Sequence, residues 1–430
     1  MNYKIIVVHP GKQHSYRVAS TMQKKGKLKC YITSVYNKPG HITHGLYKIS
    51  RGNIKKKIGS HYITDIPQKK IKLFCESLGV FSLVSLKIPF LRKFYTNVNN
   101  YLNDSFGKKT FKFIKKNKPD MVISYDYNSA ILFERLASEC PDVVRVLDVS
   151  IITRPFMQEI FRNDYEKTNE RALVDNYAEI WSKESISRVY REINNADYFL
   201  APSQIVKNSL IYCGVNEEKI KIVPYGTDCS KFEYKEKNVQ EGPLKLIFVG
   251  AVDYRKGIHH LLNVISRFKV NEVTVKLVGA YNSEDSIYKN YHTAKNIQFC
   301  GFVTRDILAT YYQEADVFVL PSLGEGMAMV IMEAMSCGLP VIVSDKTGGN
   351  DAIKNGVEGF EFEAGNDEQL YERIKWFIEH KECILDMGKK AREKAEMYTW
   401  NQYGENLVKA LDEIMEEKES ENIDICNSGK

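Results

Sequence analysis

The stretch V-F-V-L-P-S-L-G-E-G-M-A-M-V-I-M-E-A-M-S-C-G-L-P-V-I-V-S, residues 317–344, decides the fold. Its first four residues form an apolar run, typical of a buried strand, which Pro321 ends. Helix-forming residues follow over 327–337, Gly338 ends the helix, and 341–344 begin a further strand. Strand, glycine loop and helix in this order predict a parallel α/β sheet. They also place a helix N-terminus beside a flexible loop, an arrangement that binds phosphate.

Two glutamates give this stretch its chemistry. Glu325 lies in the loop, and Glu333 follows with seven residues between them. If the helix begins near Met327, Glu333 lies about 9 Å along the helix axis from that start, at ~1.5 Å per residue. Ionised carboxylates only accept hydrogen bonds, so they suit the hydroxyl pairs of sugars and riboses. Taken singly, either glutamate is more simply a turn residue or a solvated helix residue. The two together, with the glycines and flanking strands, favour a sugar at the loop, a diphosphate at the helix end and a ribose near Glu333.

Four further motifs occur in order around this stretch. They are A-P-S-Q-I-V-K-N-S-L at 201, V-P-Y-G-T-D at 223, F-V-G-A-V-D-Y-R-K-G at 248 and G-F-V at 301. With the E-x7-E spacing, they resemble glycosyltransferase family four, which comprises retaining transferases that use nucleotide sugars. The resemblance covers residues 195–400 well and the first 150 residues loosely. It implies the GT-B fold, in which two Rossmann-like parallel-sheet α/β domains face each other across a cleft.

The alternation of strands and helices supports a matching division of the chain. The predicted parts are an N-terminal acceptor domain (1–230) with a basic insert (35–118), a linker (231–242), a C-terminal nucleotide-sugar domain (243–399), a crossover helix (400–417) and a tail (418–430). An apolar stripe in the crossover helix predicts packing, and the resemblance implies that it packs on the first domain. The acidic composition of the tail predicts disorder.

Two adjacent cations follow the strand predicted over 244–249. Lys256 matches the lysine that binds the donor diphosphate in the family, and Arg255 precedes it. Many relatives also carry arginine where this chain has Ala251, so we expect Arg255 to supply the missing charge. The chain has no D-x-D pair to hold a divalent metal. We therefore expect no metal and no cofactor besides the nucleotide-sugar donor, with the cations and the helix end neutralising the leaving diphosphate.

The resemblance implies roles for several other residues. The backbone of the loop and helix start would grip the sugar and the β-phosphate, and the nucleobase would lie at the turn after residue 301. The donor-binding residues predicted in this way are Gly11, Gly250, Phe302, Val303, Gly326, Met327, Ala328, Met329 and Glu333. Glu325, Lys256 and Arg255 are the predicted catalytic residues, together with Asp148. Asp148 ends a predicted strand where many relatives have a histidine that faces the reacting sugar.

Charge is unevenly distributed along the chain. Residues 1–120 contain 25 lysines and arginines against 4 acidic residues, although the formal charge of the whole chain is only +7. In the basic insert, lysines surround bulky apolar residues, a pattern typical of amphipathic helices on an anionic membrane surface. The alternative is a helix pair packed on the sheet with a solvated basic face. No nucleic-acid-binding module is recognisable, so we expect no nucleic acid partner.

Two features that the sequence lacks predict where in the cell the protein works. No apolar run reaches the ~18 residues that cross a bilayer, and the nine cysteines are scattered without a C-x-x-C pair. We expect a cytoplasmic protein that binds peripherally to the inner face of the membrane.

The resemblance predicts a retaining glycosyltransferase of the hexosyltransferase type. It would move a sugar from a nucleotide-diphosphate donor to a hydroxyl of a glycan or lipid-linked acceptor, in cell-envelope polysaccharide or glycolipid synthesis. Two alternatives remain open. One is a GT-B epimerase or hydrolase of nucleotide sugars, and the other is a non-catalytic donor-binding subunit. The absence of G-x-G-x-x-G after the first strand argues against a dinucleotide oxidoreductase.

Overall fold

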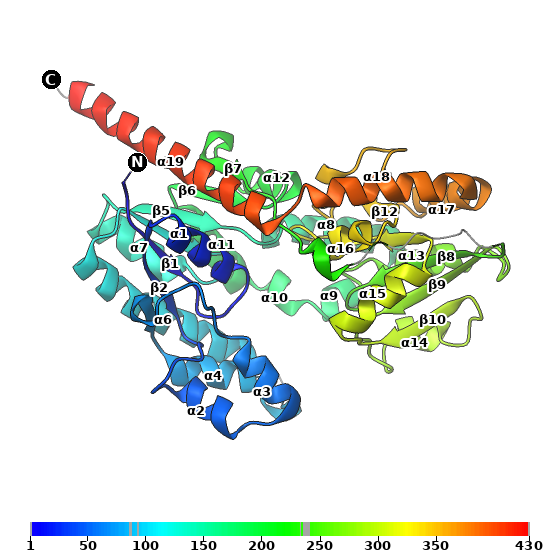
Figure 1. The fold of residues 1–430 in the computed structure, drawn as a ribbon, viewed down its shortest axis with the longest axis horizontal. Coiled ribbons are helices and arrows are strands. Elements are labelled where there is room, and N and C mark those ends of the chain that lie inside the picture. The colour runs from blue at the N-terminus through cyan, green and yellow to red at the C-terminus, as the bar shows by residue number, and fades with distance from the viewer. Residues whose placement is uncertain (1, 86–87, 93, 233, 235–240, 429–430) are drawn as a thin grey trace.

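The computed structural model describes residues 2–85, 88–92, 94–232, 234 and 241–428. Two parallel sheets organise the chain, as predicted, and helices cover them (Figure 1). The predicted two-domain GT-B architecture is confirmed. Most of the predicted linker, residues 233 and 235–240, lies outside the described residues.

The N-terminal domain is built on a seven-stranded sheet with the order β3-β2-β1-β4-β5-β6-β7. Its parallel strands are β1 (Ile5–Val8), β2 (Leu28–Thr33), β3 (Ile71–Leu73), β4 (Met121–Tyr125), β5 (Val144–Asp148), β6 (Tyr198–Ala201) and β7 (Ile220–Ile222). Its helices are α1 (Ser15–Lys24), α2 (Ile42–Ile49), α3 (Gly52–Gly59), α4 (Glu76–Ser85), α5 (Pro89–Arg92), α6 (Tyr95–Asn117), α7 (Ala130–Glu139), α8 (Arg154–Thr168), α9 (Ala172–Asp175), α10 (Ala178–Trp181), α11 (Lys183–Ile193) and α12 (Gln204–Tyr212). The apolar runs of β1, β4 and β5 are buried, which places the central strands in the core.

The C-terminal domain is built on a six-stranded parallel sheet with the order β10-β9-β8-β11-β12-β13. Its strands are β8 (Leu244–Val249), β9 (Val273–Val278), β10 (Ile297–Gly301), β11 (Val317–Leu320), β12 (Val341–Ser344) and β13 (Gly359–Phe362). Its helices are α13 (Ile258–Ile265), α14 (Ser286–Tyr291), α15 (Arg305–Glu314), α16 (Met329–Ser336), α17 (Asp367–Glu379) and α18 (Ile384–Glu396). Residues 317–344 therefore form β11, α16 and β12 at the centre of this domain.

The last helix, α19 (Trp400–Ser428), returns from the C-terminal domain to the N-terminal domain (Figure 1). The guanidinium of Arg17 in α1 lies 4.7 Å from the ring centroid of Trp400, and Lys27 Nζ lies 2.9 Å from Asp412 Oδ1. The predicted apolar stripe is buried, namely Tyr403, Leu407, Leu411 and Ile414. The predicted end at 417 and the disordered tail were wrong, because the helix continues to Ser428. Glu417 and Glu421 form ion pairs with lysines next to and within β7, which holds this part of the helix on the domain.

The basic insert forms α2 to α6 together with the edge strand β3. We expected residues 71–73 to belong to an amphipathic helix, but they pair with β2 at the edge of the sheet. Ile71 is fully buried there, so sheet pairing overrides the local pattern of lysines and apolar residues. In the described part of the chain, no helix combines the length and apolar character needed to cross a bilayer.

Candidate active site

Glu325 holds both predicted cations of the C-terminal domain. Its Oε1 atom lies 2.7 Å from Nη1 of Arg255 and 2.7 Å from Nζ of Lys256, and it accepts a hydrogen bond of 3.0 Å from Ser322 Oγ. Arg255 also donates to the carbonyl oxygen of Gly324. The loop after β11 and the loop after β8 thus meet at a single carboxylate.

Opposing effects act on this carboxylate. Burial alone would raise the pKa of Glu325, but the positive charges of Lys256 and Arg255 outweigh it and hold the pKa below its usual range. Glu325 is therefore ionised near neutral pH. The carboxylate of Asp253 also acts on Arg255, and its Oδ1 accepts a hydrogen bond of 3.0 Å from the Lys256 amide. Both cations converge on Glu325, so an anionic ligand that takes the place of this carboxylate would meet both of them.

The loop that carries Glu325 also touches the N-terminal domain. A Cβ atom on Gly326 would lie 1.8 Å from the carbonyl oxygen of Ser150, so only glycine fits this approach. The amide of Ile152 faces the carbonyl oxygen of Glu325 at 3.4 Å. The segment after β5 is thus in direct contact with the glycine loop, at the junction of the two domains.

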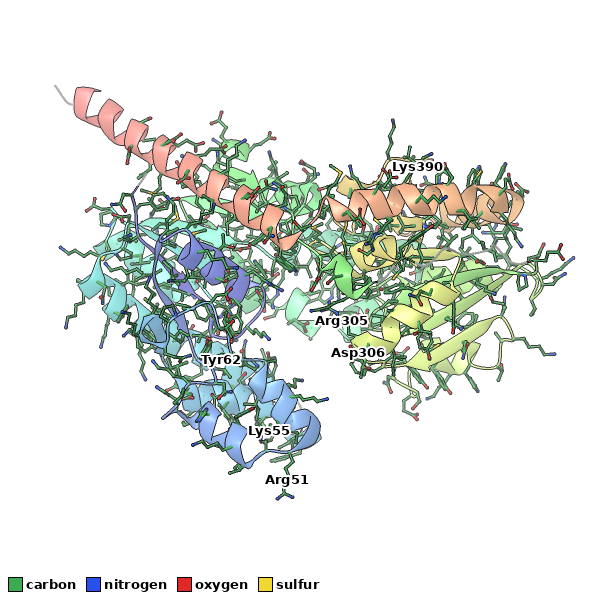
Figure 2. The ribbon with its side chains drawn as sticks, in the orientation of Figure 1. Arg51, Lys55, Tyr62, Arg305, Asp306 and Lys390 are labelled. Atoms are coloured by element: carbon green, nitrogen blue, oxygen red, sulfur yellow. The ribbon has the colours of Figure 1, made fainter. Side chains whose placement is uncertain are left out.

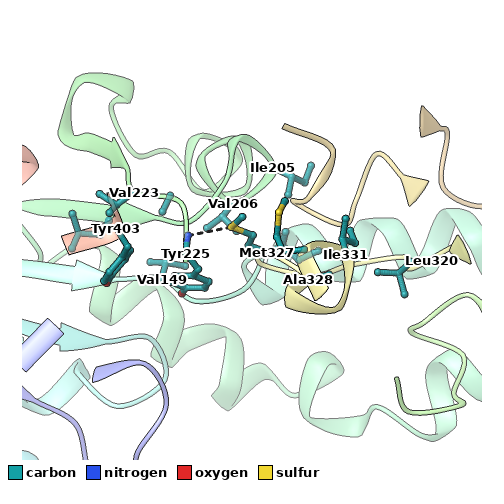
Figure 3. Packing of buried hydrophobic residues seen from close by; sticks show 14 of the residues in the cluster. Val149, Ile205, Val206, Val223, Tyr225, Leu320, Met327, Ala328, Ile331 and Tyr403 are labelled. Atoms are coloured by element: carbon teal, nitrogen blue, oxygen red, sulfur yellow. Dashed lines mark hydrogen bonds between the residues drawn. The ribbon is translucent and has the colours of Figure 1, made fainter. Parts of the chain in front are cut away.

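The helix after this loop begins later than predicted. The helix α16 starts at Met329, and Ala328 precedes it in an extended conformation. The Ala328 amide donates to the carbonyl oxygen of Thr347 at 3.0 Å, so this amide is used within the protein. The Met327 side chain packs at the domain junction, where its sulfur accepts a hydrogen bond of 3.2 Å from the Tyr225 amide (Figure 3). Of the four residues predicted to bind the donor at this helix start, Met327 and Ala328 thus make contacts within the protein, Gly326 precedes them in the loop, and Met329 begins α16.

Glu333 faces the other end of the predicted donor site. Its Oε1 lies 2.5 Å from Nη2 of Arg305, the first residue of α15, and burial raises the pKa of the Glu333 carboxyl despite this arginine. Phe302 and Val303 lie in the turn between β10 and α15, and Phe302 is 80% exposed. The Arg305 pair therefore joins the predicted ribose glutamate to the segment predicted to hold the base.

Gly250 ends β8 beside the cation pair. Its φ of 153° lies at the margin of the region that favours glycine. A Cβ atom there would lie 3.6 Å from Cε of Lys256. The structure thus brings Gly250, Lys256, Arg255 and Glu325 together.

In the N-terminal domain, Asp148 ends β5 as predicted and is buried. Its Oδ2 lies 2.8 Å from Nε2 of His14, at the start of α1. The His14 ring also contacts the rings of Tyr125 and Tyr225, at centroid distances of 5.1 and 4.6 Å. The contact with Asp148 therefore holds the His14 ring in place next to Tyr225.

A cavity of about 480 Å³ opens in the N-terminal domain between β1, β4, α4, α6 and α8. Its polar lining includes His9, Gly11, Asp126, Asn128, Arg154 and Glu179. The predicted Gly11 is thus a cavity residue, and its amide donates to Nδ1 of His9 at 2.7 Å. Burial lowers the pKa of His9 to about 4, so this imidazole is neutral and can accept that bond.

Asp126 was not among the predicted site residues. It follows β4, and its carboxylate oxygens accept hydrogen bonds of 2.9 and 3.2 Å from Ser150 Oγ. Burial raises its pKa to about 7. Because the Ser150 carbonyl touches Gly326, Asp126 connects the cavity to the glycine loop. The only sequence signal was its place directly after a predicted strand, where ligands gather in α/β sheets.

Comparison with known proteins adds family evidence to this geometry. Residues 230–394 match the family model "Glycosyl transferases group 1". The chain is 27% identical over 248 residues to the sulfoquinovosyl transferase SQD2 of Arabidopsis thaliana, covering 54% of this chain and 48% of that protein. It is 26% identical over 321 residues to the UDP-Gal:alpha-D-GlcNAc-diphosphoundecaprenol alpha-1,3-galactosyltransferase of Escherichia coli, covering 71% and 76%. The chain spans about half the length of several such curated relatives.

Solved structures show the same fold. The protein HepE of Anabaena, crystallised in complex with UDP, superposes with a TM-score of 0.60 at 17% identity, covering 95% of this chain and all of that chain. Both domains are included in this similarity. The arrangement of the two sheets is therefore that of a known two-domain architecture.

Proposed function

We propose that the chain, whose residues 230–394 match the group 1 glycosyl transferase model and whose two domains have the GT-B fold, transfers a sugar from a nucleotide-diphosphate donor to a hydroxyl group. The acceptor is a glycan or a lipid-linked glycan, and the product belongs to cell-envelope polysaccharide or glycolipid synthesis. Relatives named for diphosphoundecaprenol acceptors support this class of acceptor.

The observation that carries the proposal is the convergence of Arg255, Lys256 and Glu325 on one point beside the glycine loop. The donor diphosphate binds to the two cations, and Glu325 turns to accept hydrogen bonds from the sugar. Departure of the sugar builds negative charge on the β-phosphate, which the cations stabilise more strongly than in the ground state. These protein charges do the work of a metal ion, so the transfer step needs no divalent cation.

The nucleoside lies along α16 towards α15. Glu333 accepts hydrogen bonds from the ribose diol, since a carboxylate has about four acceptor positions and can accept further bonds beside those from Arg305 and Tyr312. The exposed ring of Phe302 lies at the position expected for the base. The phosphate oxygen that leaves also receives the acceptor proton, which keeps both reactions on one face of the sugar and retains its configuration.

The acceptor enters through the cavity of the N-terminal domain. This cavity combines polar groups such as Asn128 and Glu179 with apolar side chains such as Leu83 and Tyr95, which suits a sugar with an apolar extension. Asp126 accepts a hydrogen bond from the acceptor at the end nearest the glycine loop. Leu83 belongs to α4, so the cavity reaches the helices of the basic insert.

These helices bind an anionic lipid bilayer. Large apolar side chains are exposed on them, including Ile49, Ile54, Phe81 and Phe90. Basic side chains accompany them, and Figure 2 shows Arg51 projecting away from the rest of the molecule at the end of α3. Apolar insertion and attraction to acidic headgroups act together on such a surface. The protein therefore works as a peripheral enzyme on the cytoplasmic side.

A panel of nucleotide sugars and nucleoside diphosphates tests the proposal. A matching donor should raise the melting temperature, because it binds only the folded state. Incubation of that donor with lipid-linked glycan should then give an extended glycan with the donor's anomeric configuration. Free sugar or a rearranged nucleotide sugar as the main product would instead identify a hydrolase or an epimerase. Donor binding without any product would identify a donor-binding subunit.

A further inference from the structure

We infer that Asp164, His259 and His260 form a binding site for one divalent transition-metal ion, with zinc as the best match, at the junction of the two domains. None of the three is hydrogen-bonded to Glu325, and the inference does not rest on the transfer reaction proposed above, although the His259 ring contacts that of Tyr254, which precedes Arg255. Asp164 lies in α8, and the two histidines lie in the first turn of α13.

The three side chains present their donor atoms to one point. Nε2 of His260 lies 2.7 Å from Oδ1 of Asp164, and Nε2 of His259 lies 3.1 Å from Oδ2 of the same carboxylate. One ligand atom from each residue falls within 4.8 Å of the others. Asp164 and His260 are buried, and His259 is nearly so. Burial and short separation distinguish this group from a chance cluster of surface residues.

A second carboxylate fixes the orientation of His260. Nδ1 of His260 pairs with Oδ1 of Asp367 at 2.7 Å, and Asn263 holds the other oxygen of Asp367 at 2.5 Å. This leaves Nε2 of His260 pointing at Asp164. A carboxylate behind the distal nitrogen is the usual support of a histidine that binds zinc, because it sets the tautomer and raises the basicity of the ligand.

A glycine backbone passes close to the same point. Gly365 has a φ of 73° just before α17, and a Cβ atom on it would lie 2.9 Å from Oδ1 of Asp164 and 3.7 Å from Nε2 of His260. A larger residue would therefore crowd the donor atoms.

The donor set selects the class of ion. Two imidazoles and one carboxylate match zinc, cobalt and nickel, whereas magnesium and calcium prefer oxygen ligands. Three protein ligands leave a fourth position for water. The pKa of Asp164 is held below its usual range by the two histidines despite burial, so its carboxylate is ready to bind.

Binding changes the partners of His260 and Asp164. The ion takes the lone pair of Nε2 of His260, a proton on that nitrogen leaves to the solvent, and Nδ1 keeps its proton and donates it to Asp367. Coordinate bonds replace the hydrogen bonds of Asp164, so the ion ties α8 to α13.

Calorimetry of the tag-free chain, treated with chelator and exchanged into clean buffer, tests the inference. Zinc should bind with one ion per chain. Cobalt should give the visible absorption of a low-symmetry site with nitrogen and oxygen ligands. Zinc should also raise the melting temperature.

Variants separate this site from other metal-binding groups. His259→Gln and Asp164→Asn should each weaken zinc binding by at least tenfold. Asp367→Asn keeps all three ligands and should weaken it by about 10–100-fold, as expected for an outer partner. His292→Gln, at an exposed position directly after α14, is the matched control and should bind as the wild type does. Absence of zinc binding at 100 µM, or equal binding by His259→Gln and wild type, would show that the cluster is an ion-pair network only.

Discussion

Nζ of Lys256 lies 2.7 Å from Oε1 of Glu325, although three strands, β9, β10 and β11, lie between the two residues in the sequence. The pair places the predicted diphosphate lysine and the first glutamate of the E-x7-E spacing at one point. Without a donor, the Glu325 carboxylate forms an ion pair with the ammonium group of Lys256. A bound diphosphate can take its place, because it carries more negative charge and more acceptor atoms.

Glu325→Gln should lower turnover by at least about 100-fold, the scale seen when one preorganised electrostatic contact is removed. Binding of the nucleoside diphosphate should not weaken, because the substitution frees Arg255 and Lys256. Steady-state kinetics with calorimetry measures both effects, and circular dichroism checks the fold. Ser322→Ala removes only one hydrogen bond to Glu325 and serves as the control. Near-normal turnover of Glu325→Gln would refute the role of this carboxylate.

Lys256→Met should weaken binding of the nucleoside diphosphate by about 10–150-fold, because one charged hydrogen bond contributes ~1.5–3 kcal/mol. Isothermal titration with the best ligand of the nucleotide panel measures the change. Lys276→Met removes a lysine of β9 that pairs with Glu314 on the surface, and its affinity should equal that of the wild type. Equal affinities for both variants would contradict the diphosphate site.

Excess chelator should leave the initial transfer rate unchanged, because Lys256, Arg255 and the start of α16 neutralise the leaving group. The assay is run well below the melting temperature, so that any loss of a structural ion at Asp164 does not unfold the protein. A rate that falls to background with chelator, and returns with magnesium or manganese, would show that a metal acts in the transfer step.

Asp126→Asn should stabilise the protein at high pH and not at low pH. Burial raises the pKa of Asp126 to about 7 in the folded state, against about 4 when unfolded. The protonated carboxyl of Asp126 therefore makes its full contribution to the free energy of unfolding below pH 4, and this contribution is lost as the pH rises through 7. Melting temperatures at pH 4.5 and 8.5 measure this, with the larger gain expected at pH 8.5. Equal differences at both pH values would contradict the buried, titrating carboxyl.

Vesicles containing anionic lipid should sediment the protein, and neutral vesicles should not. The double substitution of Ile49 and Ile54 by Ser should reduce binding to anionic vesicles, since both side chains are exposed on α2 and α3. Ile307→Ser, at an exposed position of α15, is the control in the other domain. Sedimentation with neutral vesicles to the same extent would refute the membrane surface.

Much of the fold could be predicted because parallel strands buried on both faces read as short apolar runs. The strands predicted over 244–249 and 317–320 are β8 and β11, with the same bounds, for this reason. The edge strand β3 was missed, because Ile71 and Leu73 alternate with lysines and local pattern does not reveal a partner strand. The start of α16 was misplaced because a tertiary bond, from the Ala328 amide to Thr347, keeps the chain extended before Met329.

The candidate site was only partly predictable. The family motifs predicted roles for Lys256 and Glu325, and the structure brings these two side chains together. Asp126 and Asp164 have no such signal, because their properties come from burial and from partners that are remote in sequence. Asp148 shows the opposite case. Its strand-end position was predicted correctly, yet the structure commits its carboxylate to His14.

The packing of α19 bears on the order in which the protein forms during translation. Tyr403 and Leu407 fill the N-terminal domain, and Asp412 binds Lys27 at the start of β2. The ribosome makes these residues nearly 400 positions after the first strand. The first domain to emerge must therefore wait for the second before its surface is closed, and until then it presents an apolar groove that chaperones can shield.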